Sequence, residues 1–289
     1  MCCIATEAND CLAGGGRLKD RCIVLVPALN EEATISSVIA DLHTHGFRRV
    51  RVIDNGSSDD TAASARLSGA EVISEPRRGY GRACWTGLQN LPSGVEWVLF
   101  CDADGSSDLR DLERMVSAAT ETDLVFGERR TNRTNRPAMT AAQRFGNALA
   151  TTLIRLSWGH RYADLGPLRL VRTEALERIA MRDRGFGWTV EMQVRAVELG
   201  LRVREVPVRY RNRRGGTSKI SGTISGTIRA GVVIVATISR LFITSLARRL
   251  ASSPLPPGRL NSEPLMAASR TCPEAPLELS RVNAAASFR

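Results

Sequence analysis

The 289-residue chain has little lysine, few aromatic side chains and no Cys-x-x-Cys pair. Lysine occurs only at Lys19 and Lys219, so arginine supplies nearly all of the 40 basic residues and the net charge of +10. The 5% aromatic content argues against a nucleic-acid surface of interleaved aromatic and basic residues. The odd total of seven cysteines, without metal-ligand spacing, disfavours both a disulfide framework and a zinc site.

The chain also lacks a secretory signal and a long uncharged run. No basic region followed by an apolar run stands at the N-terminus, so we expect a cytoplasmic protein with reduced cysteines. The C-terminal segment 220–248 is apolar, but its uncharged stretch 230–239 is too short to cross a bilayer. We predict a helix there, either buried in the core or lying on the inner face of a membrane as a peripheral contact.

Composition divides the chain into a leader, a domain and a tail. Residues 1–20 predict a flexible leader, and residues 252–289 predict a disordered tail. Between them, helical spacing alternates with strand-like runs, which are expected at 21–26, 50–53, 70–74, 97–101 and 124–126. The alternation predicts one α/β domain over 21–219, with a doubly wound, mostly parallel, Rossmann-like sheet. Ligands of such sheets bind beyond the carboxyl ends of the strands.

The strongest chemical signal is the acidic pair Asp102 and Asp104, directly after the strand expected at 97–101. Two carboxylates at a strand end can turn toward one cation, and Mg²⁺ and Mn²⁺ prefer oxygen ligands and bridge to substrate phosphates. A plain turn also accepts Asp and Gly. The position after a strand, with other polar motifs nearby, favours the metal site and makes Asp104 a candidate catalytic residue.

Two further polar motifs follow the first two expected strands. Pro27 is expected to end the first strand, and Asn30 can cap the helix that follows. Glu31 can accept hydrogen bonds from a ribose or a base. Asp54 ends the second strand and can do the same, and one of the two serines after Gly56 can cap the next helix.

Two segments are rich in both arginine and glycine. In the first, Arg78, Gly79 and Gly81 at a helix start resemble an anion cradle. The second, residues 211–219, contains Arg213 and Lys219. It has the composition of a mobile loop that closes over a diphosphate, and equally of a solvated basic loop.

Taken in order, seven segments resemble the family 2 glycosyltransferases of the GT-A fold, and most closely the dolichyl/polyprenyl-phosphate sugar synthases. They read VLVPALNEE, IDNGSSDDT, GYGRACWTG, FCDADG, FGERR, ADLGPLR and RRGGTSK, within roughly residues 21–240. The resemblance implies an inverting transfer from a UDP- or GDP-sugar to a polyprenyl phosphate or a related glycan acceptor. It also implies Mg²⁺ or Mn²⁺ as cofactor.

The resemblance assigns roles on the donor side. It implies that the nucleotide pocket is lined by the residues of the first two motifs, which are Pro27, Asn30, Glu31 and Asp54. It further implies that the donor diphosphate is held by a metal and by basic side chains, through Asp102, Asp104, Arg213 and Lys219.

On the acceptor side, the resemblance places Arg129 near the acceptor phosphate. The chain reads Gly-Pro-Leu-Arg at 166–169, where the polyprenyl-phosphate synthases usually read Ser-Gly-Phe-Arg, so the acceptor is left open. A phosphate acceptor is already an anionic nucleophile. A hydroxyl acceptor would need a carboxylate to take its proton, for which Asp164 and Glu191 are the candidates.

Other functions remain compatible with parts of this pattern. A nucleotidyltransferase also uses a doubly wound domain and a metal, but it needs a Gly-rich basic loop where residues 27–31 read Pro-Ala-Leu-Asn-Glu. A non-catalytic nucleotide-sugar-binding module would not need the acidic pair. Nucleic-acid binding rests on the net charge alone, and we expect no nucleic-acid partner.

Overall fold

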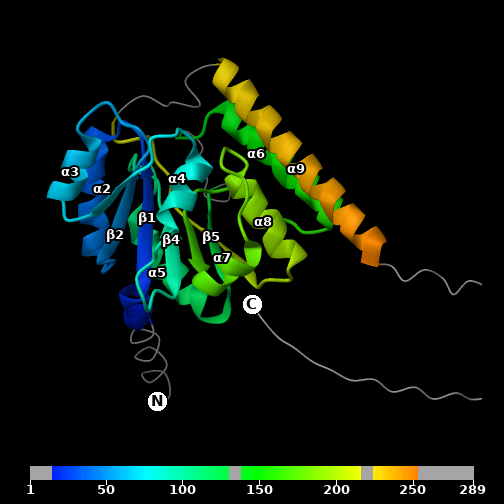
Figure 1. Ribbon diagram of the computed structural model, residues 1–289, viewed down its shortest axis with the longest axis horizontal. Coiled ribbons are helices and arrows are strands. Elements are labelled where there is room, and N and C mark those ends of the chain that lie inside the picture. The colour runs from blue at the N-terminus through cyan, green and yellow to red at the C-terminus, as the bar shows by residue number, and fades with distance from the viewer. Residues whose placement is uncertain (1–14, 130–137, 216–223, 253–289) are drawn as a thin grey trace, which may run out of the picture.

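The computed structural model describes residues 15–129, 138–215 and 224–252. Within these residues, seven strands form a single sheet in the order β3-β2-β1-β4-β6-β5-β7, with helices on both faces (Figure 1). The strands are β1 (Cys22–Ala28), β2 (Arg49–Asp54), β3 (Glu71–Ser74), β4 (Trp97–Phe100), β5 (Leu124–Glu128), β6 (Arg169–Arg172) and β7 (Val203–Pro207). The helices are α2 (Glu32–Thr44), α3 (Thr61–Leu67), α4 (Tyr80–Gly87), α5 (Leu112–Ala118), α6 (Ala141–Trp158), α7 (Thr173–Ile179), α8 (Trp188–Glu198) and α9 (Ile224–Ser252).

The sheet is mostly parallel, as the alternation of apolar runs predicts. Only β6 is antiparallel, and it lies between β4 and β5. The five strands expected from the sequence correspond to β1–β5. The sequence did not predict β6 and β7, because β6 has arginines at both ends and β7 is a polar edge strand with one buried residue.

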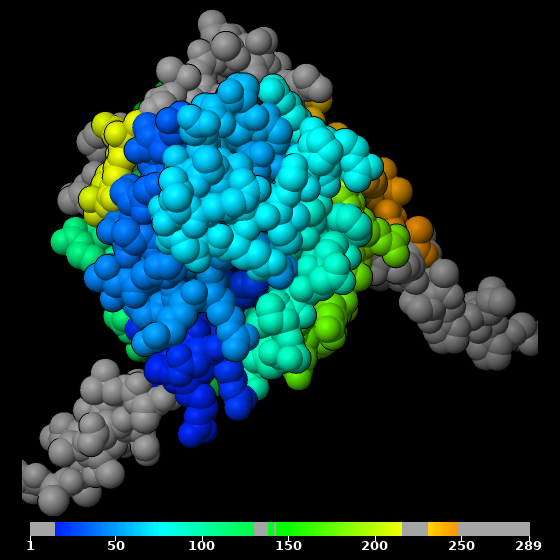
Figure 2. Space-filling view, turned by 60° about the vertical axis from the view of Figure 1, so that its left-hand side comes forward, coloured from blue at the N-terminus to red at the C-terminus, as the bar shows by residue number. Residues whose placement is uncertain are grey.

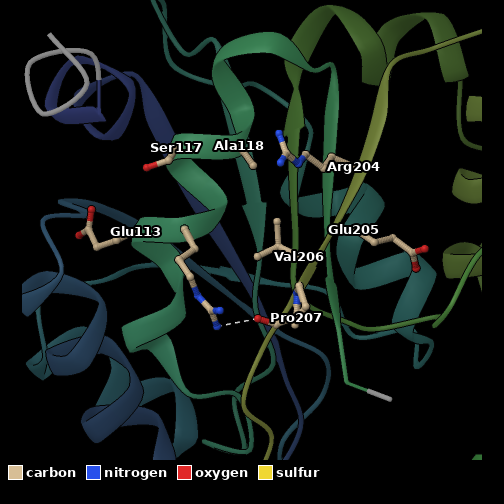
Figure 3. A pocket seen from close by; sticks show the side chains of 8 residues that line it. Glu113, Ser117, Ala118, Arg204, Glu205, Val206 and Pro207 are labelled. Atoms are coloured by element: carbon tan, nitrogen blue, oxygen red, sulfur yellow. Dashed lines mark hydrogen bonds between the residues drawn. The ribbon is translucent and has the colours of Figure 1, made fainter. Parts of the chain in front are cut away.

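Each face of the sheet has its own hydrophobic core. In β1, Val24 and Val26 pack toward α2 and α5, whereas Ile23 and Leu25 pack toward α4 and α8. This burial on both faces explains why β1 is a continuous apolar run, as is typical of a central parallel strand. Figure 2 shows the N-terminal half of the chain in blue and cyan, with α9 in orange at the margin.

The expectation that Pro27 ends the first strand is wrong, because β1 continues to Ala28. On one side, Pro27 pairs with Ile53 of β2. On the other side, β4 pairs with β1 only as far as Leu25. Proline lacks a backbone N–H, and it is tolerated here because only one neighbouring strand reaches this position.

The N-terminal end of the described chain is more ordered than its composition suggests, and the helix predicted at the C-terminal end is present. Residues 15–20, which were expected to be part of a flexible leader, are helical, and Leu18 is buried. At the other end, α9 occupies most of the predicted apolar segment and packs beside α6 and α8 (Figure 1). One side of α9 is buried through Ile238 and Leu241, so it is not a fully buried core helix. Among the described helices, none is long and apolar enough to cross a membrane.

Three of the cysteines, Cys22, Cys84 and Cys101, are free and buried. Burial raises the pKa of each of these thiols above its ordinary value, so they stay protonated. They pack in the core as small apolar side chains. The other four cysteines lie outside the described residues.

Candidate active site

The acidic pair stands at the carboxyl end of β4, where a doubly wound sheet places its ligands. Asp104 is buried, and its Oδ1 accepts a hydrogen bond from the Ser106 N–H at 2.9 Å. Burial, together with the neighbouring charge of Asp104, raises the pKa of Asp102 to about 7. The positive charges of Arg129 and Arg213 act in the opposite direction. The pair is therefore a site of concentrated negative charge that a cation would stabilise.

Arg213 joins this acidic pair to the first motif of the chain. Its Nε lies 2.8 Å from Oδ2 of Asp104, and its Nη2 lies 3.4 Å from Oε1 of Glu31. Glu31 is buried after β1, and its N–H donates to Oγ1 of Thr61 at 2.8 Å. The structure therefore gathers three of the predicted donor-site residues, Glu31, Asp104 and Arg213, into one charged cluster.

The basic segment 209–214 is fixed to the acidic segment 104–111, so this part is not the mobile loop that its composition suggested. Backbone hydrogen bonds run from Asp108 N to Arg209 O, from Arg211 N to Ser106 O, and from Arg214 N to Asp104 O, at 3.0, 2.9 and 3.1 Å. Ion pairs reinforce them, including Arg211 Nη2 to Asp108 Oδ2 at 2.6 Å. Lys219, the other predicted phosphate ligand, lies outside the described residues.

The turn after β2 holds Asp54 and Asn30 together. The Ser57 N–H donates to Oδ1 of Asp54 at 3.2 Å, and its Oγ accepts from the Asn30 N–H at 2.9 Å. The Asn30 side chain does not cap α2. Its Oδ1 instead accepts from the Ser58 N–H at 2.8 Å, which ties the loops after β1 and β2 to each other.

The capping prediction for the next helix also fails. The N-cap of α3 is Asp60, which makes no side-chain cap, and the two serines lie earlier in the loop. The serines are used to hold the loop against Asn30. The carboxyl ends of β1 and β2 thus form one braced wall, which supports Pro27, Asn30 and Asp54 beside the acidic pair.

The predicted anion cradle at the start of α4 has another structural explanation. A Cβ at Gly79 or Gly81 would lie 2.8 Å from a backbone carbonyl oxygen of the 184–185 loop. The Gly81 N–H is already bonded to Gly185 O at 3.1 Å. These glycines allow close packing between α4 and that loop, and the side chain of Arg78 is exposed.

Asn55 was missed by the sequence analysis and organises this region. It is buried, and its Nδ2 donates to the carbonyl oxygens of Glu75 and Arg77, both at 2.9 Å. Its Oδ1 accepts from the Gly79 N–H at 2.8 Å. A polar side chain directly after a strand-ending aspartate is the signal that could have pointed to it.

Arg129 and Asp164 form a buried pair on the other side of the acidic pair. The Arg129 N–H and Nε donate to Oδ2 of Asp164 at 2.9 and 2.7 Å, and its Nη2 donates to Oδ1 at 3.0 Å. The guanidinium also lies 5.0 Å from the ring centre of Tyr210. The positive charge of Arg129 also lowers the pKa of Asp102, so this cation acts electrostatically on the predicted metal residues.

Burial alone would raise the pKa of Asp164, but the charge and hydrogen bonds of Arg129 outweigh it, so the net shift is downward. A carboxylate that is held ionised by a bidentate arginine is a poor proton acceptor. The geometry therefore favours Asp164 as the residue that positions Arg129, and it does not favour a general base.

The turn that carries Asp164 is itself braced from three elements. Glu205 of β7 accepts hydrogen bonds from the N–H groups of Ala163 and Asp164 at 2.9 to 3.1 Å. Gln193 of α8 donates to the Asp164 carbonyl at 2.8 Å, and Asn147 of α6 accepts from the Leu165 N–H at 2.8 Å. These hydrogen bonds hold the Asp164 turn in place, and Asp164 in turn fixes the guanidinium of Arg129.

Glu191 does not reach this cluster through any of its hydrogen bonds. It is buried in the first turn of α8, and its Oε2 accepts from the N–H groups of Arg182 and Asp183 at 2.9 and 2.6 Å. Its Oε1 lies 3.4 Å from Nε of Arg195. These contacts make Glu191 the anchor of the loop that packs against Gly79 and Gly81, and they favour that role over catalysis.

Comparison with known proteins identifies the family to which this chain belongs. The sequence pattern described as glycosyl transferase family 2 matches residues 23–180, which is more than half of the chain. The chain belongs to glycosyl transferase family 2. An uncharacterised glycosyltransferase of Mycobacterium tuberculosis is 39% identical over 214 residues, which cover 72% of this chain and 94% of that protein.

One further sequence relative and one solved structure have more informative names. The undecaprenyl-phosphate mannosyltransferase of Micrococcus luteus is 28% identical, over 71% of this chain and 90% of that enzyme. The crystal structure of glucosyl-3-phosphoglycerate synthase from Mycobacterium tuberculosis, bound to Mn²⁺, UDP-glucose and phosphoglyceric acid, superposes with a TM-score of 0.62. It is 25% identical and covers 79% of this chain and 83% of that chain. The GT-A fold predicted from the sequence is thereby confirmed.

Asp102 and Asp104 are the residues of this site that could bind a divalent metal. In residues 15–129, 138–215 and 224–252, no three His, Cys, Asp or Glu side chains are grouped so as to hold a metal ion by themselves. Mg²⁺ and Mn²⁺ are commonly held by one or two carboxylates, with substrate phosphates and water completing the shell. Asp102 and Asp104 fit that arrangement, because burial and mutual repulsion disfavour two ionised carboxylates without a cation.

Proposed function

We propose that this family 2 enzyme transfers a sugar, with inversion, from a UDP- or GDP-sugar to the phosphate of a polyprenyl phosphate. The observation that carries the proposal is the placement of Arg129. Its buried guanidinium is fixed by Asp164, and it lies near enough to the acidic pair for its charge to lower the pKa of Asp102. One anion site thus adjoins one cation site, as a transfer between two phosphate-bearing substrates requires.

On the donor side, the wall formed by Pro27, Asn30 and Asp54 would hold the nucleoside. Asp102 and Asp104 would hold the divalent metal, which supplies charge neutralisation for the departing diphosphate. Arg213 already spans Glu31 and Asp104. It would turn toward the donor phosphates when a metal takes its place beside Asp104.

On the acceptor side, Arg129 would bind the phosphate and direct one of its oxygens toward the anomeric carbon. The new bond forms between that oxygen and the anomeric carbon as the bond to the nucleoside diphosphate breaks. No proton needs to be removed, because the acceptor phosphate is already ionised. This agrees with the engagement of Asp164 by Arg129 and of Glu191 by the 182–183 loop.

The names of the sequence relatives favour a lipid-linked phosphate acceptor, and the solved neighbour contains a small phosphorylated acid. Both ligands carry an anionic phosphate, which is the group that Arg129 would bind. We take the polyprenyl phosphate as the acceptor because several curated relatives name such lipids. Since this substrate is a membrane lipid, transfer would take place at a membrane surface.

The test has two stages. A thermal-shift screen of UDP- and GDP-sugars, with and without Mn²⁺, should show metal-dependent stabilisation by one donor class. Transfer of radiolabelled sugar is then measured to a polyprenyl phosphate and, in parallel, to 3-phosphoglycerate. Label in the lipid would support the proposal. Label in 3-phosphoglycerate alone would overturn the lipid acceptor, and no metal-dependent shift in folded protein would overturn the donor site.

A further inference from the structure

The exposed apolar side chains of this protein are concentrated on two adjacent helices. Seven of the nine large apolar residues that are exposed in the described structure lie on α6 and α9. The two helices contact each other along the flank that lies away from α2 and α3 (Figure 1). Scattered exposed apolar residues need no explanation, but a concentration on one flank marks an interaction surface.

On α6, the exposed residues form a stripe. Phe145, Leu149 and Leu156 recur at the spacing of one helix face, and the first and last are 70% and 77% exposed. The opposite face carries the buried residues Ala150 and Ile154, which belong to the core. The apolar stripe of α6 therefore points away from the sheet.

On α9, a second stripe follows the same rule. Val232, Ile243 and Leu246 are exposed, at 62%, 66% and 46%, whereas Ile238 and Leu241 are buried against the domain. Trp158 of α6 and Phe242 of α9 join the helices with ring centres 5.8 Å apart. We call the surface made by Phe145, Leu149, Leu156, Val232, Ile243 and Leu246 the α6–α9 face.

The charge of these two helices indicates which kind of partner fits the α6–α9 face. Neither α6 nor α9 contains Asp, Glu or Lys, whereas arginine occurs at six positions in the two sequences. A second copy of the chain would bring arginine against arginine, with no carboxylate on these helices to pair with it. An anionic lipid surface accepts both apolar side chains and arginines.

We propose that the α6–α9 face docks on the surface of an anionic lipid bilayer. This inference deepens the proposed function, on which its purpose rests, because it brings a lipid-linked acceptor to the enzyme. The same helix that carries the outer stripe also touches the acceptor side of the site. Asn147 of α6 accepts the Leu165 N–H, next to the aspartate that holds Arg129.

The experiment is co-sedimentation of the full chain with vesicles, without any donor or acceptor. Wild-type protein should pellet with phosphatidylglycerol vesicles, should bind less in high salt, and should stay in solution with phosphatidylcholine alone. The variant Phe145→Glu/Ile243→Glu should lose about tenfold in binding for each substitution, since burying such a side chain is worth at least a tenfold change. Leu67→Glu, at a position on α3 that is 90% exposed, should bind like wild type.

Because both substituted positions are highly exposed, the variant should melt at the wild-type temperature, which circular dichroism checks. Equal binding by the double variant and wild type would overturn the proposal. Absence of wild-type binding to phosphatidylglycerol would do the same. A wild-type dimer that the same variant dissociates, without vesicle binding, would show that a second copy covers the face. The glycosyltransferase assay in detergent is separate, so a failure here is distinguishable from a failure of the proposed function.

Discussion

The role of Asp164 as the anchor of Arg129 can be tested by Asp164→Asn. The side chain of Asp164 is 1% exposed and that of Arg129 is 12% exposed, so the pair is almost dry. Asparagine keeps the shape but removes the charge, and its NH₂ group would face a guanidinium that only donates. Breaking a buried ion pair costs about 3–5 kcal/mol, because the remaining charge stays buried without compensation.

The chain contains a matched control for this substitution. Asp123 accepts the same set of hydrogen bonds from Arg202, namely from its N–H, Nε and Nη2 at 2.9, 3.2 and 2.8 Å. Arg202, however, is 61% exposed. An exposed pair contributes about 0–1 kcal/mol, so Asp123→Asn should cost far less than Asp164→Asn. Urea unfolding at pH 7 measures both free energies.

The pH dependence of this difference follows from the lowered pKa of Asp164. A depressed carboxyl pKa stabilises the folded state above the unfolded pKa, which is about 4, and the contribution is lost as the pH falls through the folded value. The stability gap between wild type and Asp164→Asn should therefore be full at pH 7 and shrink below about pH 4. Asparagine does not titrate, so in the variant the residue at position 164 makes no pH-dependent contribution to the free energy of unfolding.

The kinetic readout separates positioning from proton transfer. An anchor for Arg129 predicts a raised KM for the acceptor, an unchanged KM for the donor, and little further loss when Arg129→Ala is added. A large loss of kcat at saturating acceptor, with the acceptor KM unchanged, would refute the reasoning and return Asp164 to the role of general base. Equal stability losses for Asp164→Asn and Asp123→Asn would refute the energetic argument.

Three further outcomes follow from the site and its supports. Asp104→Ala should abolish transfer without unfolding the protein, and wild-type turnover by that variant would contradict the metal assignment. Because the pKa of Asp102 is about 7, Mn²⁺ must displace a proton at lower pH. The stabilisation by Mn²⁺ and donor in a thermal-shift assay should therefore be clearly larger at pH 8 than at pH 6, and a pH-independent shift would count against the pair as ligands. Gly81→Ala places a Cβ within 2.9 Å of three backbone atoms and should lower the free energy of unfolding by about 1–3 kcal/mol. Gly146→Ala lies in open space on α6 and should raise the free energy of unfolding by about 0.5–1 kcal/mol. Urea unfolding of both variants checks the sign of each change.

The central strands β1, β4 and β5 could be predicted because they are buried along nearly their whole length. Such strands are largely apolar runs, and polar residues follow them, as Asp102 follows β4. Strands β6 and β7 do not have this apolar pattern. Arg169, at the start of β6, is only 1% exposed, and a sequence pattern gives no sign that an arginine will be buried.

The pairing of charges could not be predicted from composition. Arg129 and Asp164 both lie in motifs that the sequence analysis singled out, yet it treated them as separate site residues. Their contact depends on the antiparallel insertion of β6 beside β5, which no local pattern specifies. In contrast, the alternation of Arg209, Arg211 and Arg213 is a period-two signal that could have indicated an extended, paired segment.

In the structure, the segment 166–169 packs against β5 and lies behind the turn that carries Asp164. Its departure from the polyprenyl-phosphate synthases left the identity of the acceptor open. Here a Cβ at Gly166 would lie 2.1 Å from the carbonyl oxygen of Gly127, so this position supports the close approach of the segment to β5. The Arg169 guanidinium donates to Gly166 O and Thr189 O, both at 2.8 Å, behind the turn of Asp164. Substitutions in this segment would therefore act on the acceptor through the position of Arg129, whereas the selection of a lipid would depend on the α6–α9 face.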